Sequence, residues 1–206
     1  MPFCDNIAEK KPGMFSPVSA VIAAAGLSGR MGKDKAMLPY GNGSCFVENL
    51  INFFSVFGCN PVVLVVNESF DITQLKNRDF IPVINRNLNL GRSYSIHLGL
   101  QFIPNKTSCF IQNTDNPFLE KPLLESLMEA IEPDSYAVPI FEGKRGHPVL
   151  LGSSVTEHIR KQSFSMDFRE ELKSFSRIEV PYPDKRILWN INTPEDYKRF
   201  LEEARL

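Results

Sequence analysis

The sequence has no cysteine pair at a spacing typical of metal or redox sites. Its four cysteines are far apart, with no C-x-x-C pair among them: Cys4, Cys45, Cys59 and Cys109. This pattern excludes a zinc ribbon and a thioredoxin-like dithiol. A chain of 206 residues can bury a sizeable core without disulfides. We therefore expect reduced thiols.

Long hydrophobic runs and an excess of one charge are also absent. No apolar stretch reaches the roughly 20 residues that a membrane-spanning helix needs, and the first 17 residues lack the apolar centre of a signal peptide. The formal net charge is -1, from 23 basic and 24 acidic residues. This balance disfavours a protein that binds nucleic acid by neutralising phosphates. We expect a cytoplasmic protein with neither a membrane nor a nucleic acid as a partner.

What the chain does have is a regular alternation of strand and helix patterns. We predict an N-terminal extension over residues 1–17 and a single domain over 18–206. The predicted strands cover 18–25, 61–66, 81–85, 108–112, 136–141, 148–151, 178–180 and 187–191, and the predicted helices cover 45–57, 71–76, 93–102, 121–131, 166–173 and the stretch from 194 onward. Such alternation is typical of an α/β protein with a mostly parallel sheet, and the late strands form a small β insertion.

Several residues are expected to begin or end these helices. Ser44 is a candidate N-cap and Gly58 suits the position after a helix. Ser154 with Glu157 has capping-box spacing, and Thr193 to Asp196 opens the last helix with a cap and a proline. The last helix is expected to bury the stripe Tyr197, Phe200, Leu201 and Ala204.

A glycine-rich loop directly after the first strand is the strongest functional signal. The apolar run ends at Gly26, and two more glycines, Gly29 and Gly32, follow among the cations Arg30, Lys33 and Lys35. Successive N–H groups in such a turn bind anions, and Arg or Lys adds charge. The spacing fits neither the dinucleotide fingerprint nor the Walker A loop. By itself it indicates a phosphate site or, alternatively, an ordinary turn with solvated cations.

A carboxylate at the end of another strand is the candidate metal ligand. Asp115 follows the apolar stretch at 108–112, and the carboxyl ends of parallel strands meet at one edge of a sheet. A turn aspartate that bonds its own backbone has the same pattern. Asn192 is a second candidate oxygen ligand, and it also fits a simple strand end before a helix cap. No Ser-His-acid set is visible.

The loop A-A-G-x-S-x-R-M-G-x-x-K-x-x-L-P resembles the signature of the nucleotidyltransferases that make molybdenum cofactor dinucleotides. The resemblance continues to about residue 200. It implies a Rossmann-like nucleotidyltransferase fold (GT-A-like), a three-layer sandwich. It also implies that a nucleotide is transferred from a triphosphate to a phosphorylated acceptor with Mg²⁺.

The resemblance also assigns roles to individual residues. It implies that Ala24, Ala25, Gly26 and Ser28 contact the nucleotide, that Arg30 and Lys35 stabilise the triphosphate, and that Asn85, Gly91, Ser93 and Ser95 hold base and ribose. The T-D-N-P segment implies that Asp115 binds Mg²⁺. Asn192 stands where relatives often have aspartate, which removes a charge from the implied metal site. The G-H-P-V-L segment places His147 on the acceptor side, with Lys144 and Arg145 beside it.

The resemblance favours CTP as donor and molybdopterin as acceptor. The cytidylyl branch reads A-A-G where the guanylyl branch reads A-G-G, and Ala25 fills that position. A methyl group there takes space that glycine leaves for a purine. A molybdoenzyme that receives the product is a possible partner. The alternatives are transfer to another phosphate, such as a sugar phosphate, and a nucleotide-binding chaperone without turnover, for which Asn190 and Asn192 argue.

Overall fold

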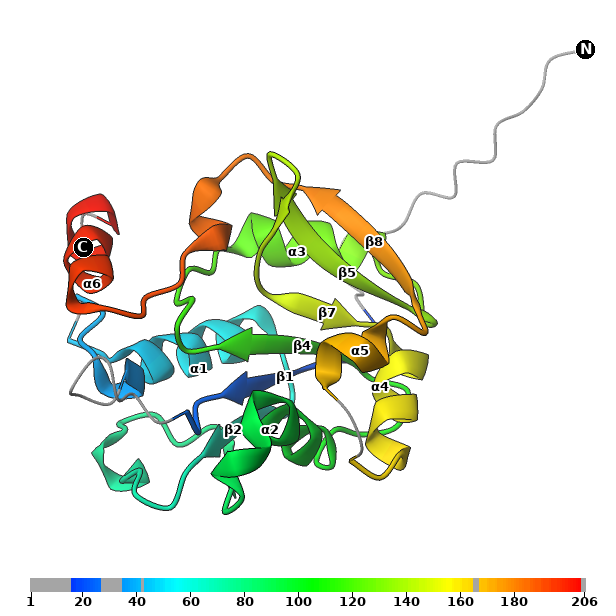
Figure 1. Ribbon diagram of the computed structural model, residues 1–206, viewed down its shortest axis with the longest axis horizontal. Helices are drawn as coiled ribbons and strands as arrows, with labels where there is room; N and C mark the ends of the chain where they lie inside the picture. The colour runs from blue at the N-terminus through cyan, green and yellow to red at the C-terminus, as the bar shows by residue number, and fades with distance from the viewer. Residues whose placement is uncertain (1–15, 27–34, 42, 165–166, 205–206) are drawn as a thin grey trace, which may run out of the picture.

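A parallel four-stranded sheet forms the centre of the computed structural model, which describes residues 16–26, 35–41, 43–164 and 167–204. The strands are β1 (Val18–Ala23), β2 (Val62–Val66), β3 (Ile81–Ile84) and β4 (Ser108–Asn113), in the spatial order β3-β2-β1-β4. β1 pairs in parallel with both β2 and β4. Their carboxyl ends therefore meet at one edge of the sheet (Figure 1).

A second, mixed part extends the sheet beyond β4. β7 (Val149–Leu151) runs antiparallel to β4, and β5 (Ser135–Phe141) runs antiparallel to β7. The short strand β6 (Lys144–Arg145) closes a hairpin with β5, and β8 (Ser176–Pro181) pairs in parallel with β5. The hairpin turn uses positive φ angles at Glu142 and Gly143. This part is the predicted β insertion.

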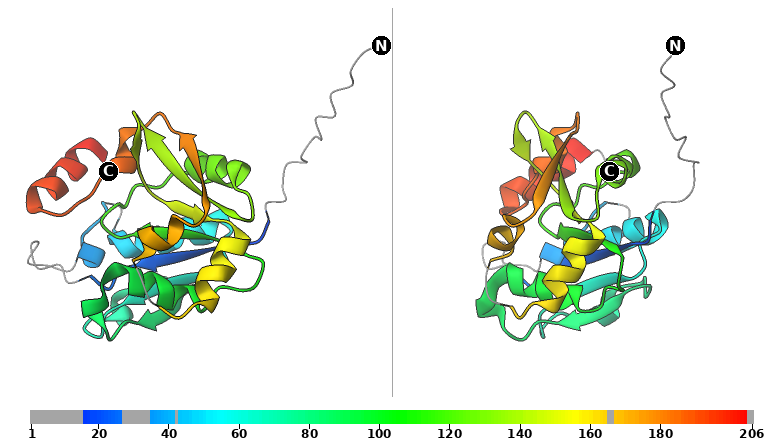
Figure 2. Two further views of the ribbon diagram at one scale, coloured as in Figure 1. Left: turned by 45° about the vertical axis from the view of Figure 1, so that its right-hand side comes forward. Right: turned by 90° about the vertical axis from the view of Figure 1, so that its right-hand side faces the viewer.

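Helices cover both faces of the sheet, which confirms the predicted three-layer α/β architecture. α1 (Phe46–Phe57) and α3 (Lys121–Ala130) share one apolar cluster with the sheet. α2 (Gly91–Leu100), α4 (Ser153–Lys161) and α5 (Phe168–Leu172) share the cluster on the other face. Figure 2 shows the sheet between α1 and α3 on one side and α4 and α5 on the other.

The strand β1 is buried on both faces because every residue in it is small or apolar. Ile22 packs in the cluster of α1, whereas Val21 packs in the cluster of α2. Gly99 lets α2 approach closely, since a Cβ there would lie 2.5 Å from Cγ1 of Val21. The sheet and α2 therefore form a tightly packed support for the loops above them.

The last helix, α6 (Pro194–Ala204), packs against the start of α1 through a small separate cluster. Phe200 in α6 and Phe46 in α1 have ring centroids 5.1 Å apart. The carboxylate of Asp196 accepts hydrogen bonds from the N–H groups of Asn192 and Thr193, and the Thr193 hydroxyl accepts one from the Asp196 N–H. The predicted cap at 193–196 is thus confirmed, as is the left-handed Gly58 after α1.

Four local predictions were wrong. The stretch 187–191 is not a strand, because a 3-10 helix, η4 (Lys185–Leu188), occupies its start. Cys45, not Ser44, is at the N-cap position of α1. Gly152, not Ser154, is at the N-cap position of α4. The backbone packs so closely there that a side chain would collide with the Glu132 carbonyl oxygen. Leu201 is exposed, because α6 touches the protein only over a narrow face.

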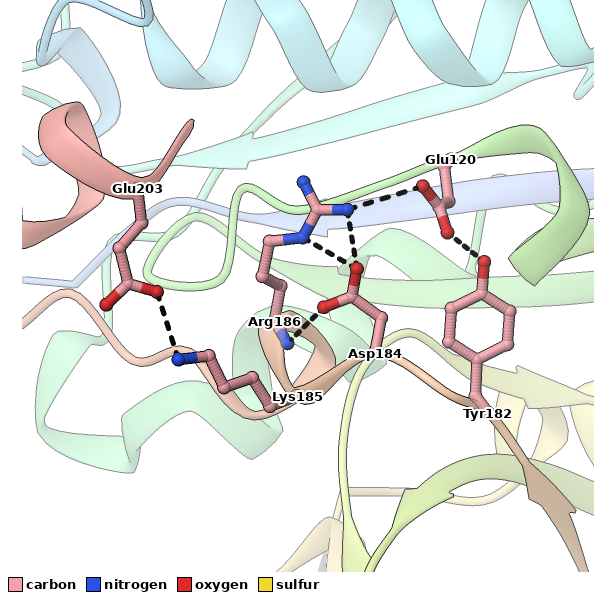
Figure 3. A network of polar contacts seen from close by, with 6 residues as sticks. All are labelled: Glu120, Tyr182, Asp184, Lys185, Arg186 and Glu203. Atoms are coloured by element: carbon pink, nitrogen blue, oxygen red, sulfur yellow. Dashed lines mark hydrogen bonds and ion pairs between the residues drawn. The ribbon is translucent and has the colours of Figure 1, made fainter. Parts of the chain in front are cut away.

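A network of ion pairs and hydrogen bonds holds η4 in place (Figure 3). The guanidinium of Arg186 lies 2.5 Å from Asp184 and 3.7 Å from Glu120, and it also lies over the ring of Phe118. The adjacent Lys185 pairs with Glu203 of α6 at 3.3 Å. The network fixes the turn that carries the Ile187 carbonyl.

None of the helices in the described ranges is long and apolar enough to cross a membrane.

Candidate active site

A cavity of about 260 Å³ lies at the carboxyl ends of β1 and β4, beside the first turn of α2. Most of the predicted site residues line it: Ala24, Ala25, Gly26, Lys35, Asn85, Gly91, Ser95 and Asp115. The segments that follow β1, β3 and β4 are distant in sequence, and the sheet brings them together. The start of the ten-residue helix α2 faces the same space, and helix N-termini favour anions. We call this space the first cavity. Ser28 and Arg30 lie outside the described residues.

Asn85 and Ser95 form a buried polar pair at the wall of the first cavity. The Asn85 amide nitrogen donates to the Ser95 hydroxyl at 2.9 Å, and the Asn85 amide oxygen accepts from the N–H of Asn87 at 2.8 Å. The pair joins the end of β3 to α2, and both of its members are buried. It therefore holds this wall rigidly at the helix start.

Asp115 presents a free carboxylate oxygen at the opposite wall. Its Oδ1 is buried and finds no hydrogen-bond partner among the residues that the structure describes. The backbone carbonyl of Asp115 accepts from the Ile191 N–H at 2.7 Å, which brings the following Asn192 close to it in the fold. An unpartnered carboxylate oxygen at such a position suits a cation or a hydrogen-bond donor of a ligand.

Lys35 is joined to the second candidate metal ligand. Its Nζ donates a 2.7 Å hydrogen bond to Oδ1 of Asn192. Lys35 lines the first cavity, whereas Asn192 is not among the lining residues. The amide oxygen of Asn192 thus already accepts a hydrogen bond from the lysine.

The donor set matches a hard divalent cation that shares its ligands with a substrate. Within the described ranges, no group of three or more His, Cys, Asp or Glu side chains gathers in one place. Asp115 offers an unpartnered carboxylate oxygen, and the amide oxygen of Asn192, the other predicted ligand, is bonded to Lys35 nearby in the fold. Mg²⁺ usually binds through one or two carboxylates together with substrate phosphates and water. These residues fit that mode of binding.

A second cavity, of about 450 Å³, adjoins the first on the side of β5 and β7. The predicted binding residue His147 lines this cavity and not the first one. Its Nε2 lies 3.2 Å from the amide nitrogen of Asn113, and its backbone N–H donates to the Ile187 carbonyl. Gly146 allows this approach, because a Cβ there would lie 2.5 Å from that carbonyl oxygen.

His147 is uncharged at neutral pH. Burial lowers the pKa of its imidazole to about 4, and the positive charges of Arg92 and Arg169 act in the same direction. Its Nδ1 is buried without a partner among the described side chains. The ring can therefore offer a hydrogen bond to a ligand but brings no charge of its own.

Lys144 and Arg145, the two cations next to His147 in sequence, do not place an unpaired positive charge in the second cavity. Lys144 is exposed and is not among the lining residues. Arg145 does line the cavity, but its Nε lies 2.9 Å from a carboxylate oxygen of Glu179. The β5–β6 hairpin leaves Lys144 outside the cavity and brings Arg145 next to β8.

Sequence reasoning missed residues that line the boundary between the cavities. Arg92 and Asn113 line both of them, and Arg169 lines the second. Arg92 directly follows Gly91, and Asn113 ends β4, so their places beside predicted site residues were a usable signal. Arg169 is in α5, and only the fold brings it here.

Two curated proteins are similar to this chain over most of its length. A probable molybdenum cofactor guanylyltransferase of Natranaerobius thermophilus is 32% identical over 209 residues, covering 93% of this chain and 97% of its own length. The molybdenum cofactor cytidylyltransferase of Escherichia coli K12 is 25% identical over 191 residues, covering 89% and 95%.

A solved structure, that of Rv0371c from Mycobacterium tuberculosis H37Rv, superposes with a TM-score of 0.76. It has 16% sequence identity and covers 92% of this chain and 100% of its own. The same protein was also solved as a complex with manganese. At this identity the likeness shows the fold alone.

Residues 20–177 match the model of the MobA-like NTP transferase domain. With that match and the 32% identity over nearly its whole length, the chain belongs to the MobA-like NTP transferase family.

Proposed function

We propose that the protein transfers CMP from CTP to the terminal phosphate of molybdopterin and releases pyrophosphate. The observation that carries this proposal is the first cavity, which Lys35 and Asp115 line together with Ala24 to Gly26, and in which an oxygen of Asp115 has no partner among the described residues. Nucleotidyl transfer needs a cation for the triphosphate and a hard oxygen ligand for a metal, and these two side chains supply them.

In the proposed reaction, an oxygen of the acceptor phosphate attacks the α-phosphorus of CTP. A phosphorus–oxygen bond forms there, and the bond from the α-phosphorus to the oxygen bridging to the β-phosphate breaks. That oxygen leaves with pyrophosphate. Lys35 neutralises charge that develops on the leaving group, and Asn192 orients the lysine through their hydrogen bond. Asp115 and Asn192 would hold Mg²⁺, which neutralises triphosphate charge when bound.

The proposed choice of CTP depends on Ala25. This residue is buried and lines the first cavity, so its methyl group takes space there that glycine would leave for a larger base. The two curated relatives differ on this point, because one is named a guanylyltransferase and the other a cytidylyltransferase. The base is therefore the first variable to measure.

The test is pyrophosphate release. The protein is incubated with Mg²⁺, molybdopterin and each of the four NTPs in turn. The expected result is fast release with CTP that requires the acceptor. A panel of sugar and polyol phosphates in place of molybdopterin tests the acceptor, and the Asp115→Asn variant is the inactive control.

A second candidate function is nucleotide binding without turnover, as in a chaperone. The observation that favours it is that Asn192 brings no negative charge and already accepts a hydrogen bond from Lys35. In that case CTP binds with measurable affinity but no NTP releases pyrophosphate with any acceptor. That outcome overturns the proposed transfer.

A further inference from the structure

The second cavity has an excess of positive charge. Its charged lining residues are five cations and one acid: Arg92, Arg145, Arg169, Lys173, Arg177 and Glu170. Three of the cations have acidic partners. Lys173 pairs with Glu170 at 2.6 Å, and Arg145 and Arg177 both pair with Glu179 at 2.9 and 3.0 Å.

The other two cations, Arg92 and Arg169, lack such partners. In the part of the chain that the structure describes, neither guanidinium makes a hydrogen bond or an ion pair with another side chain. Both charges act on His147, whose pKa they lower together with burial. Both arginines line the second cavity together with this histidine. Arg92 lines the first cavity as well.

A set of hydrogen bonds between two helix starts positions these arginines. The hydroxyl of Ser93 in α2 donates to Oδ2 of Asp167 at 2.9 Å and accepts from the N–H of Phe168 at 3.0 Å. Oδ1 of Asp167 accepts from the N–H of Arg169 at 2.8 Å. Ser93 and Asp167 thus join the start of α2 to the start of α5, within two residues of each arginine.

The hydrogen bonds at Asp167 and the charges of the two arginines hold the pKa of its carboxyl below the usual value. Asp167 therefore stays ionised at neutral pH. Both oxygens of this carboxylate are already hydrogen-bonded, one to Ser93 and the other to a backbone N–H. Its single negative charge therefore does not neutralise the two positive charges of Arg92 and Arg169. Arginine binds phosphate oxygens with paired, charge-assisted hydrogen bonds.

The remaining walls of the second cavity are largely apolar. They include Ile96, Ile111 and Val138, with the rings of Tyr136 and Phe168. A cavity of this kind suits a compound with an anionic end and a flat ring whose faces pack against these walls. A strongly hydroxylated sugar would leave its polar groups without partners against these walls.

We propose that Arg92 and Arg169 bind the phosphate of the acceptor, and that the acceptor is a phosphomonoester with a flat ring body. This inference rests on the proposed transferase function, since it identifies the second cavity as the acceptor site of that reaction. Arg92, at the boundary, contacts both the acceptor phosphate and the nucleotide. Arg169 contacts the acceptor alone, and Ser93 is a positioning residue that acts through Asp167.

Steady-state kinetics with CTP and molybdopterin test the assignment. Arg169→Gln is expected to raise the acceptor KM about 10- to 100-fold and to leave the CTP KM within about twofold, because one charge-assisted contact is lost. Arg92→Gln is expected to raise both KM values. Ser93→Ala is expected to raise the acceptor KM about threefold, and Ser93→Thr, which keeps the hydroxyl, to restore it.

Arg86→Gln is the matched control. It removes an arginine whose guanidinium pairs with Glu68 on an exposed surface, and it is expected to change neither KM. An acceptor KM that is unchanged in Arg169→Gln, while the wild type turns over, overturns the anion site and leaves the transferase proposal standing.

A binding measurement separates the two proposals. Phenyl phosphate is titrated calorimetrically into the wild type, Arg169→Gln and Arg86→Gln, each saturated with CMP so that the first cavity is filled. Binding that is lost only in Arg169→Gln supports the anion site even if no NTP releases pyrophosphate, in which case the transferase proposal alone fails. Binding that is equal in all three proteins overturns the site.

Discussion

The two cavities share a boundary but are built in different ways. The first is lined by small residues, a buried Asn–Ser pair, a lysine and a carboxylate, mostly in segments that directly follow parallel strands. The second is lined by arginines, aromatic rings and aliphatic residues, many of them from β5, β7, β8 and α5. Under the proposed function, the parallel part of the sheet positions the nucleotide and the mixed part positions the acceptor.

Asp115 provides the sharpest test of the first cavity. Asp115→Asn is expected to lower turnover by about 100-fold or more, since the substitution removes the charge of the proposed metal ligand. Its buried Oδ1 has no partner to lose in the described chain, so the thermal midpoint is expected to stay nearly unchanged. Pyrophosphate release and thermal unfolding are measured beside Asp134→Asn, an exposed control. Near-normal turnover in Asp115→Asn removes it from the metal site.

Lys35 comes next in expected effect. Lys35→Ala is expected to slow turnover by about 100-fold, because the triphosphate loses the cation that stabilises its developing charge. Stability is expected to change by less than about 1 kcal/mol, since the side chain is partly exposed. Lys185→Ala, which removes a lysine paired with Glu203 on the surface, is the control. Equal activity in the two variants would show that Lys35 does not act on the triphosphate.

His147 tests the second cavity through pH. Its pKa is about 4 in the folded protein and near 6.5 when unfolded. Between these values the unfolded chain binds the extra proton, so this histidine lowers stability as pH falls from 6.5 toward 4, by roughly 3 kcal/mol in total. His147→Gln is expected to flatten that part of the pH–stability curve. Denaturant unfolding at several pH values measures it.

The control for this experiment is His158→Gln, which replaces an exposed histidine on α4. The wild-type slope is expected to remain in that variant. A slope that persists in His147→Gln as well would show that the pH dependence arises from other groups, and that His147 is not held neutral by its surroundings.

Ala25 tests base choice in the first cavity. Ala25→Gly is expected to raise the rate with GTP relative to CTP by about tenfold, because one methyl group typically changes discrimination by ~1–3 kcal/mol. The ratio of kcat/KM for the two nucleotides measures it. Ala36→Gly, a buried alanine outside the lining of the cavity, is the control for general loosening. An unchanged ratio in Ala25→Gly would mean that Ala25 contributes to packing and not to the choice of base.

Asn192 is expected to show the smallest effect. Asn192→Asp adds a carboxylate beside Lys35 and the proposed metal, so the Mg²⁺ concentration for half-maximal rate is expected to fall about threefold. Mg²⁺ titration at fixed CTP measures it, with Asn190→Asp as the neighbouring control. If the Mg²⁺ requirement does not move, Asn192 serves only to orient Lys35.

Much of the first cavity could be predicted from the sequence because its parts are local. Ala24 to Gly26, Asn85, Gly91 and Asp115 each follow a strand that its apolar run identifies, and parallel strands end at a common edge. The three-layer architecture followed from the same alternation. The wrong predictions concern helix starts, the exposed Leu201 and the stretch at 187–191, where tertiary contacts decide between similar local patterns.

The sequence by itself determined the α/β class and the strand-end residues of the first cavity, since these depend on short-range patterns of burial and turn chemistry. Only the tertiary structure decided that Lys35 bonds Asn192, that Glu179 pairs with Arg145, and that Arg92 and Arg169 line one cavity with His147. These contacts join residues far apart in the chain. Charge pairing depends on distance in space, and local sequence patterns do not contain that distance.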